Sequence, residues 1–174
     1  MTEIIYRLRE ELEDMDQTQS GGLNSVLSIA LLAAGNVKIY TRINALGEYY
    51  IIRPRVDLKV DIGQATGRRI ALPNQQLRFD AFHFHVGIQI VTNPRNIPAE
   101  NLLHEQMISI CRQTLGGIGG NESYNDMVNF PNVFIAEVLK DTGVSDSVID
   151  KDEGLEHTTF GYEGIVCIRP AAWN

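Results

Sequence analysis

The sequence predicts an α+β domain in which helices flank a mixed, mainly antiparallel sheet, with an extended β-hairpin or loop around residues 44–80. Two periodicities predict this class, because apolar residues recur at helical spacing in some segments and alternate with polar residues in others. The order of the segments is the third observation: two helices, several strands, one helix and further strands.

The chain of 174 residues fits one domain, residues 1–174, because a domain of this size buries enough surface to fold without disulfides or metals. No internal repeat or linker divides it. Hydrophobic residues make up 44% and charged residues 21% of the chain, as in ordinary globular proteins, so we expect nearly the whole chain to be folded.

The first segments are predicted to be helical. An amphipathic helix is expected over 2–15, followed by a flexible connection over 17–22. A second, shorter and more apolar helix is expected over 24–34, ended by Gly35. The apolar stripe of the first helix consists of Ile4, Ile5, Leu8, Leu12 and Met15.

Alternation of apolar and polar residues then begins. It predicts a strand over 37–43 and a turn around 44–47 that reverses the chain. A second strand, with one polar face, is predicted over 55–62. Pro54 directly before it suggests an edge position, because proline cannot donate a hydrogen bond to a neighbouring strand.

Residues 63–76 are predicted to form a long loop or hairpin tip that carries Arg68 and Arg69. The clearest strand of the sequence follows over 82–90, where successive residues face opposite sides of a sheet. Phe82, Phe84, Val86, Ile88 and Ile90 are expected on one side, and His83, His85, Gly87 and Gln89 on the other.

The remaining elements are a long helix and two strands. The helix is predicted over 98–115, with Pro98 at its first position and a stop at the glycines 116–117. Strands are expected over 133–139 and 158–169. Between them we expect an acidic loop through Asp146, Asp150, Asp152 and Glu153.

Charge and cysteine content exclude several classes of protein. The net charge of −7 argues against a sequence-specific nucleic-acid binder, which neutralises several phosphates with a basic surface. Cys111 and Cys167 lack the paired spacing of a zinc or redox site, so two buried reduced thiols are expected, with a single bridge as the alternative. The charged N-terminal segment does not resemble a signal peptide, and the apolar run over 26–34 is shorter than the ~20 residues that span a bilayer.

His83 and His85 are the strongest indication of enzyme chemistry, because two imidazoles on one side of a strand can share a metal ion. Such a site needs a third ligand, and the chain offers Gln89 but no carboxylate before Glu100. The favoured interpretation places both histidines on a solvated or interface face of the strand.

Other catalytic patterns do not occur in the sequence. The glycines at 116–120 follow a helix and lack the lysine and hydroxyl residues of a phosphate loop. Cys111 is expected on the apolar face of a helix, which does not suit a nucleophile, and the acidic residues after 145 lack the order of a calcium loop. The sequence thus predicts a protein that is not an enzyme, has no cofactor, and acts by binding other proteins.

The second half of the chain resembles the tail terminator proteins of long-tailed bacteriophages, the family typified by the minor tail protein U of phage lambda. The resemblance is carried by FHFHVGIQIVTNP over 82–94, by the P-x-E-N-L-L helix that begins at Pro98, and by TGVSDSVIDKDEGLEHTTFGYEGIVCIRP over 142–170. With the N-terminal helix, this succession of elements covers most of the chain. The segment 37–76 and the apolar second helix depart from the family pattern.

The resemblance implies a hexameric ring at the head-proximal end of the tail, which ends polymerisation of the tail tube and joins the tail to the head. Its partners are then further copies of the chain, the tail tube protein and a head-tail connector or stopper protein, while DNA passes through the lumen without specific binding. It also implies a virion protein of the neck region, assembled in the host cytoplasm. Open sheet edges at 55–62 and 158–169 are expected to suit pairing between subunits.

We expect partner contacts in two polar segments, because long polar loops on a rigid sheet usually carry binding residues. The candidates are Arg68, Arg69, Asp150, Asp152 and Glu153. Three alternatives stay open at this point: another head-tail connector or tail-completion subunit, a small metal-dependent enzyme that uses the paired histidines, and a cytoplasmic ligand-binding module.

Overall fold

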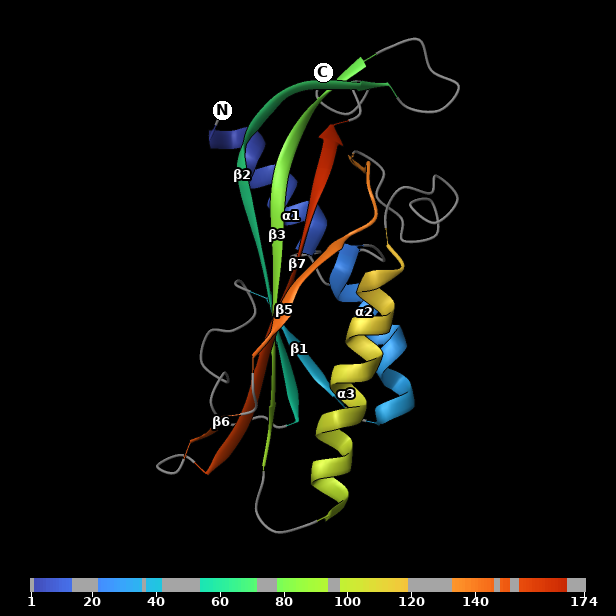
Figure 1. The fold of residues 1–174 in the computed structure, drawn as a ribbon, viewed down its shortest axis with the longest axis vertical. Coiled ribbons are helices and arrows are strands. Elements are labelled where there is room, and N and C mark those ends of the chain that lie inside the picture. Colours follow the sequence, from blue (N-terminus) through green and yellow to red (C-terminus); the bar gives the residue numbers. More distant parts are fainter. Residues whose placement is uncertain are drawn as a thin grey trace.

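The computed structural model describes residues 2–13, 22–35, 37–41, 54–71, 78–93, 98–118, 133–145, 148–150 and 154–168. Within these ranges the chain forms three α-helices, a short 3-10 helix and one seven-stranded sheet. The fold is α+β, as the sequence predicts, and the helices share one hydrophobic core with the sheet (Figure 1). No helix among the described residues is long and apolar enough to cross a membrane.

The three helices pack against one face of the sheet, and α2 lies beside α3 (Figure 1). They are α1 (Thr2–Glu13), α2 (Gly22–Leu31) and α3 (Pro98–Gly116), which confirms the three predicted helices within a few residues. α2 continues into the 3-10 helix Leu32–Ala34 and ends at Gly35. Gly35 has a φ of 108°, a conformation that favours glycine, so the predicted stop is confirmed.

The sheet has the strand order β1, β2, β3, β7, β4, and β5 and β6 also pair with β7. Its three long strands, β2 (Arg55–Ala71), β3 (Arg78–Thr92) and β7 (Leu155–Ile168), are antiparallel neighbours. The short strands are β1 (Lys38–Tyr40), β4 (Val133–Ile135), β5 (Lys140–Val144) and β6 (Val148–Asp150).

β1 and β2 are the one parallel pair in this sheet, with Lys38 opposite Arg55 and Tyr40 opposite Asp57. Parallel neighbours require a return crossover, so a hairpin does not join β1 directly to β2. The turn predicted around 44–47 is not tested by this pairing. The residues of that turn lie outside the described part of the chain.

β7 lies inside the sheet, so the open edge expected at 158–169 is wrong. β3 pairs along one side of β7, and β6, β5 and β4 follow one another along the other side. The sequence indicated only a strand over 133–139 and an acidic loop here. The three strands are short, and β5 is exposed over its whole length, so they carry no hydrophobic alternation that would reveal them.

The extended hairpin predicted around 44–80 is confirmed as β2 and β3, but β2 continues to Ala71. Arg68 and Arg69 are therefore on a strand and not in a loop or hairpin tip, with Arg69 opposite Asp80. Two irregularities of register interrupt the pairing between residues 62 and 69. Such irregularities bend a ladder, and the distal ends of both strands curve away over the top of the molecule (Figure 1).

The core lies between the helices and the sheet. The predicted alternation of β3 is confirmed, because its apolar residues are buried while His83 and His85 are exposed. Burying one large apolar side chain stabilises the fold by about 1.5–3 kcal/mol. The helices contribute Leu8, Leu12, Leu23, Leu27, Leu31, Met107, Cys111 and Leu115, and β3 contributes Phe82, Phe84, Val86, Ile88 and Ile90.

Candidate functional site

The face of the sheet that points away from the helices carries the polar residues of the long strands. We call it the outer face. Because side chains alternate along a strand, residues of β2, β3 and β7 that do not contribute to the main core lie here. Its exposed middle consists of Lys59, Asp61, His83, His85, Thr159 and Glu163.

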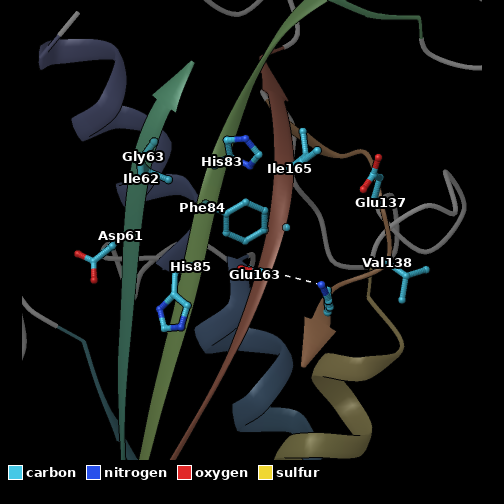
Figure 2. Close-up of a pocket in the computed structure, with 12 residues that line it drawn as sticks. Asp61, Ile62, Gly63, His83, Phe84, His85, Glu137, Val138, Glu163 and Ile165 are labelled. Atoms are coloured by element: carbon cyan, nitrogen blue, oxygen red, sulfur yellow. Dashed lines mark ion pairs between the residues drawn. The ribbon is translucent and has the colours of Figure 1, made fainter. Parts of the chain in front are cut away.

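Four charged or titratable residues form a row across this middle region. Asp61 on β2 is opposite His85 on β3, and His85 is opposite Glu163 on β7. Glu163 is in turn opposite Lys140 on β5, and Lys140 Nζ lies 3.7 Å from Glu163 Oε1 (Figure 2). Lys59 Nζ lies 3.3 Å from Asp61 Oδ2 on the same strand. The register of four strands thus aligns acidic and basic groups that are far apart in the sequence.

An open cleft of about 550 Å³ lies at this row, between β2, β3, β7 and the segment 137–140 (Figure 2). Three carboxylates line it, from Asp61, Glu137 and Glu163, together with the single ammonium group of Lys140. The lining therefore has more carboxylates than ammonium groups, and Lys59, 3.3 Å from Asp61 Oδ2, offsets one of these carboxylates from outside the lining. The cleft suits a cationic partner better than an anionic one.

The two histidines of the H-x-H motif both line the cleft, but their rings lie against different parts of β7. His83 is opposite Ile165 and lies beside it in Figure 2. His85 extends over Gly161, four residues away on the same strand. Among the described residues, no group of three or more His, Cys, Asp or Glu side chains is placed to hold a metal ion.

Gly161 leaves the space that the His85 ring occupies. A Cβ at this position would lie 2.6 Å from His85 Nε2 and 2.8 Å from Thr142 Oγ1, closer than real Cβ contacts. Gly87, directly opposite on β3, leaves the same part of the ladder without a side chain. The sequence does not reveal the role of these glycines, because it depends on the pairing of β3 with β7.

The helix side of the sheet holds a buried histidine, His104, whose role the sequence does not predict. His104 on α3 is almost fully buried, and its Nδ1 and Nε2 atoms each lie 2.8 Å from a threonine hydroxyl, that of Thr92 and that of Thr158. Burial is the main cause that lowers the pKa of His104, and nearby Glu156 and Glu105 partly oppose it. These two hydrogen bonds connect α3 to β3 and β7, and His104 lies away from the outer face.

β5 is attached to α3 by a small network. Arg112 on α3 donates to Asp141 on β5, Asp141 also accepts from the backbone N–H of Gly143, and the Tyr162 hydroxyl donates to the Arg112 carbonyl. The hydrogen bonds from Arg112 and Gly143 lower the pKa of the Asp141 carboxyl. This network fixes the position of β5 beside the cleft.

Among the described residues, both edges of the sheet are covered in part. On one edge, β1 covers the start of β2, and Glu13 Oε1 accepts a hydrogen bond from the Val60 backbone N–H. On the other edge, β5 is short, begins with Lys140 and contains a register shift before Gly143, whose φ is 108°. Short, bulged and lysine-bearing edges are devices that disfavour edge pairing. The edge expected at 55–62 is covered at 55–57 and at Val60, and pairing between subunits along the rest of it stays a prediction.

The sequence-predicted contact residues do not lie together. Arg68 and Arg69 are on the distal part of β2, whereas Asp150 is the last residue of β6, toward the other end of the molecule (Figure 1). Asp150 is half-buried, and its carbonyl accepts a hydrogen bond from Gly154. Asp152 and Glu153 lie outside the described residues. None of the described candidates lines the cleft.

Comparison with known proteins gives distant structural likenesses. No family model and no curated protein matches the chain. Among solved structures, a chain of the "Virion of native gene transfer agent (GTA) particle" aligns with 92% of this chain and 94% of its own length, at 9% identity and a TM-score of 0.43.

Proposed function

We propose that this chain is a structural protein of a phage-like virion that acts as a tail terminator. It forms a ring at the head-proximal end of the tail, ends polymerisation of the tail tube, and joins the tail to a head-tail connector or stopper protein. The observation that carries this proposal is the order of elements. An N-terminal helix, a set of strands, the alternating strand β3, the long helix α3 and the closing strand β7 follow one another as in the family that the sequence resembles.

The surfaces of the molecule support a role in assembly. A subunit of a closed ring needs two different surfaces, one for each neighbour. The polar middle of the outer face is exposed, and the distal end of the β2–β3 hairpin curves away from it at a separate place (Figure 1). Neither requires bond-making chemistry, so the proposed role includes no catalysis and no cofactor.

The charge of the chain supports the passage of DNA through such a ring. With a net charge of −7, a ring of these subunits repels the phosphate backbone and does not retain it. The proposed partners are copies of the chain, the tube protein and the connector, and the proposed location is the neck of the virion after assembly in the host cytoplasm.

The direct experiment is assembly of tail tubes from the purified tube protein with and without this chain. We expect shorter tubes that bear an added ring at one end in negative-stain images. Mass photometry should detect a species with a mass close to six times 19.4 kDa. A chain that stays monomeric and leaves tube length unchanged would contradict the proposal.

The nearest alternative is another connector or tail-completion subunit. Labelling this chain on purified tails separates the two, because a terminator lies directly on the last ring of the tube. A label found only on the head side of the junction would favour the connector.

A further inference from the structure

The two halves of α3 are attached to the rest of the fold in different ways. We call residues 98–107 the first half of α3 and residues 108–116 the second half. In the first half, the His104 ring lies between the hydroxyls of Thr92 on β3 and Thr158 on β7, with one ring nitrogen 2.8 Å from each. All three residues are almost fully buried. A buried titratable side chain therefore joins this half of the helix to two central strands.

The second half of α3 is attached by groups that do not change their charge in mildly acidic solution. The Arg112 guanidinium donates to Asp141 on β5, and the Tyr162 hydroxyl donates to the Arg112 carbonyl. Hydrogen bonds lower the pKa of the Asp141 carboxyl, so this group stays ionised. Just after the helix, the Ile118 carbonyl accepts a hydrogen bond of 3.0 Å from the Leu139 N–H.

Apolar burial also differs between the two halves. Among the described side chains of the first half, Met107 is fully buried and Leu103 is partly buried, whereas Leu102 is 70% exposed. In and just after the second half, Cys111, Leu115 and Ile118 are fully buried. The first half therefore depends more on the hydrogen bonds of His104 for its attachment.

Protonation of His104 disturbs these two hydrogen bonds. A neutral imidazole has one donor and one acceptor nitrogen, so one threonine hydroxyl donates to the ring and the other accepts from it. In the protonated ring both nitrogens donate, and the hydroxyl that donated before must turn its proton to another acceptor. The positive charge is also costly at a buried position. Protonation therefore weakens the attachment of the first half.

The charged groups near His104 come from two elements. Burial is the largest effect on the His104 pKa and lowers it, while the carboxylates of Glu156 on β7 and Glu105 on α3 raise it and His157 on β7 lowers it. β3 faces the ring with the hydroxyl of Thr92. α2 and the 3-10 helix that continues it have no titratable residue. The pKa is therefore lowered while the helix is attached, and the ordinary value of 6.5 applies once it separates.

We propose that the first half of α3 is an acid-released flap, in which protonation of His104 lets residues 98–107 separate from the sheet while the second half stays attached. This opening is local and differs from unfolding of the whole chain, as expected for a helix whose halves are held by different contacts. It uncovers Met107 and the strand surface around Thr92 and Thr158, all of which are buried in the closed form. The proposal does not depend on the terminator role.

Hydrogen exchange of the purified chain, followed by mass spectrometry between about pH 7.5 and pH 5, tests the proposal. The rates are corrected for the intrinsic effect of pH on amide exchange. Peptides from the first half should then exchange faster below pH 6.5, by up to about tenfold per pH unit, because opening takes up one proton. Low urea concentrations should leave this exchange nearly unchanged and accelerate that of β3 and β7, since a local opening exposes little surface.

Two variants separate the effect of His104 from that of other groups. His104→Gln removes the titratable ring and keeps a side chain that can donate and accept hydrogen bonds, so exchange of its first half should lose the pH dependence. His83→Gln is the matched control, because it makes the same substitution at an exposed histidine of β3 and should keep the wild-type response. Circular dichroism checks that both variants are folded.

The proposal is supported by exchange of the first half that depends on pH, is insensitive to urea and loses its pH dependence in His104→Gln. It is overturned if pH has no effect on the first half, or if exchange there rises with urea as steeply as in β3 and β7. A folded His104→Gln variant that keeps the wild-type response also overturns it. If that variant does not fold, the pH and urea series of the wild type decides alone.

Discussion

The carboxylate of Glu13, the last residue of α1, lies 2.6 Å from the backbone nitrogen of Val60 on β2 and accepts its hydrogen bond. Val60 lies beyond the part of β2 that β1 covers, and no other described strand lies on that side of it, so α1 supplies the acceptor there. Glu13 is fully buried, although its position in the sequence resembles the polar side of the helix.

Replacing Glu13 with alanine should destabilise the fold. The substitution leaves a buried backbone N–H without this acceptor, which costs about 1–3 kcal/mol. Glu13→Gln keeps a side-chain oxygen that can accept the bond and should cost less. Urea unfolding monitored by circular dichroism measures both, and equal losses for the two variants would contradict a role for this hydrogen bond.

His104 should make stability depend on pH in mildly acidic solution. Burial lowers its pKa in the folded state, whereas the unfolded chain takes up the proton near the ordinary value of 6.5. The unfolded state therefore binds more protons below about pH 6.5, and stability, which is complete above that value, falls as pH decreases toward the lowered pKa. Urea unfolding of the wild type and of His104→Gln between about pH 8 and pH 5 tests this. The wild type should lose stability more steeply, and parallel curves would refute the assignment.

Two glycines of β7 should respond differently to alanine. At Gly164, on the core side, a Cβ would lie 2.7 Å from Leu139 Cδ2 and 2.9 Å from the Phe84 ring, so Gly164→Ala should cost about 1–3 kcal/mol by overpacking. Gly161→Ala should cost less, because the His85 ring on the exposed outer face can rotate away. Thermal melting ranks the two variants, and NMR should show displaced His85 ring resonances in the second one alone.

Both cysteines should be unreactive in the folded chain. Burial raises the pKa of Cys111 to about 12 and that of Cys167 to about 11, and the thiolate is the reactive form. Cys167 lies in a small buried cluster with Ala81 and Ile165. A thiol reagent at about pH 8 should modify neither cysteine until urea unfolds the chain, after which both react. Rapid modification of the native protein would show that one of these regions opens easily.

The sequence predicted correctly those parts of the fold that depend on residues close together in the chain. The alternation of β3 placed Phe84 inside and His83 outside, and Gly35 ended the second helix, because both depend only on neighbouring residues. The parallel pairing of β1 with β2 and the enclosure of β7 depend on contacts between distant segments, which a periodicity cannot report.

The sequence predicted only part of the candidate site, because the rest also depends on contacts between distant segments. His83 and His85 were placed on the exposed face, but the row from Asp61 to Lys140 exists only through the register of four strands. His104 did leave a signal in the sequence, since it shares helical spacing with Met107 and Cys111 on the buried side of α3. Spacing alone does not reveal that Thr92 and Thr158 supply its hydrogen-bond partners.

The central place of β7 has a consequence for synthesis on the ribosome. In the described structure β4, β5 and β6 have no strand partner other than β7, and β3 pairs with β7 along its second side from Ala81 to Thr92. A nascent chain that has not yet exposed Leu155–Ile168 therefore holds three short strands without a hydrogen-bonding neighbour, and β3 is paired with β2 alone. The sheet cannot be completed before this segment is synthesised. Until then the growing polypeptide depends on its helices, on the β2–β3 hairpin, or on a chaperone to avoid aggregation.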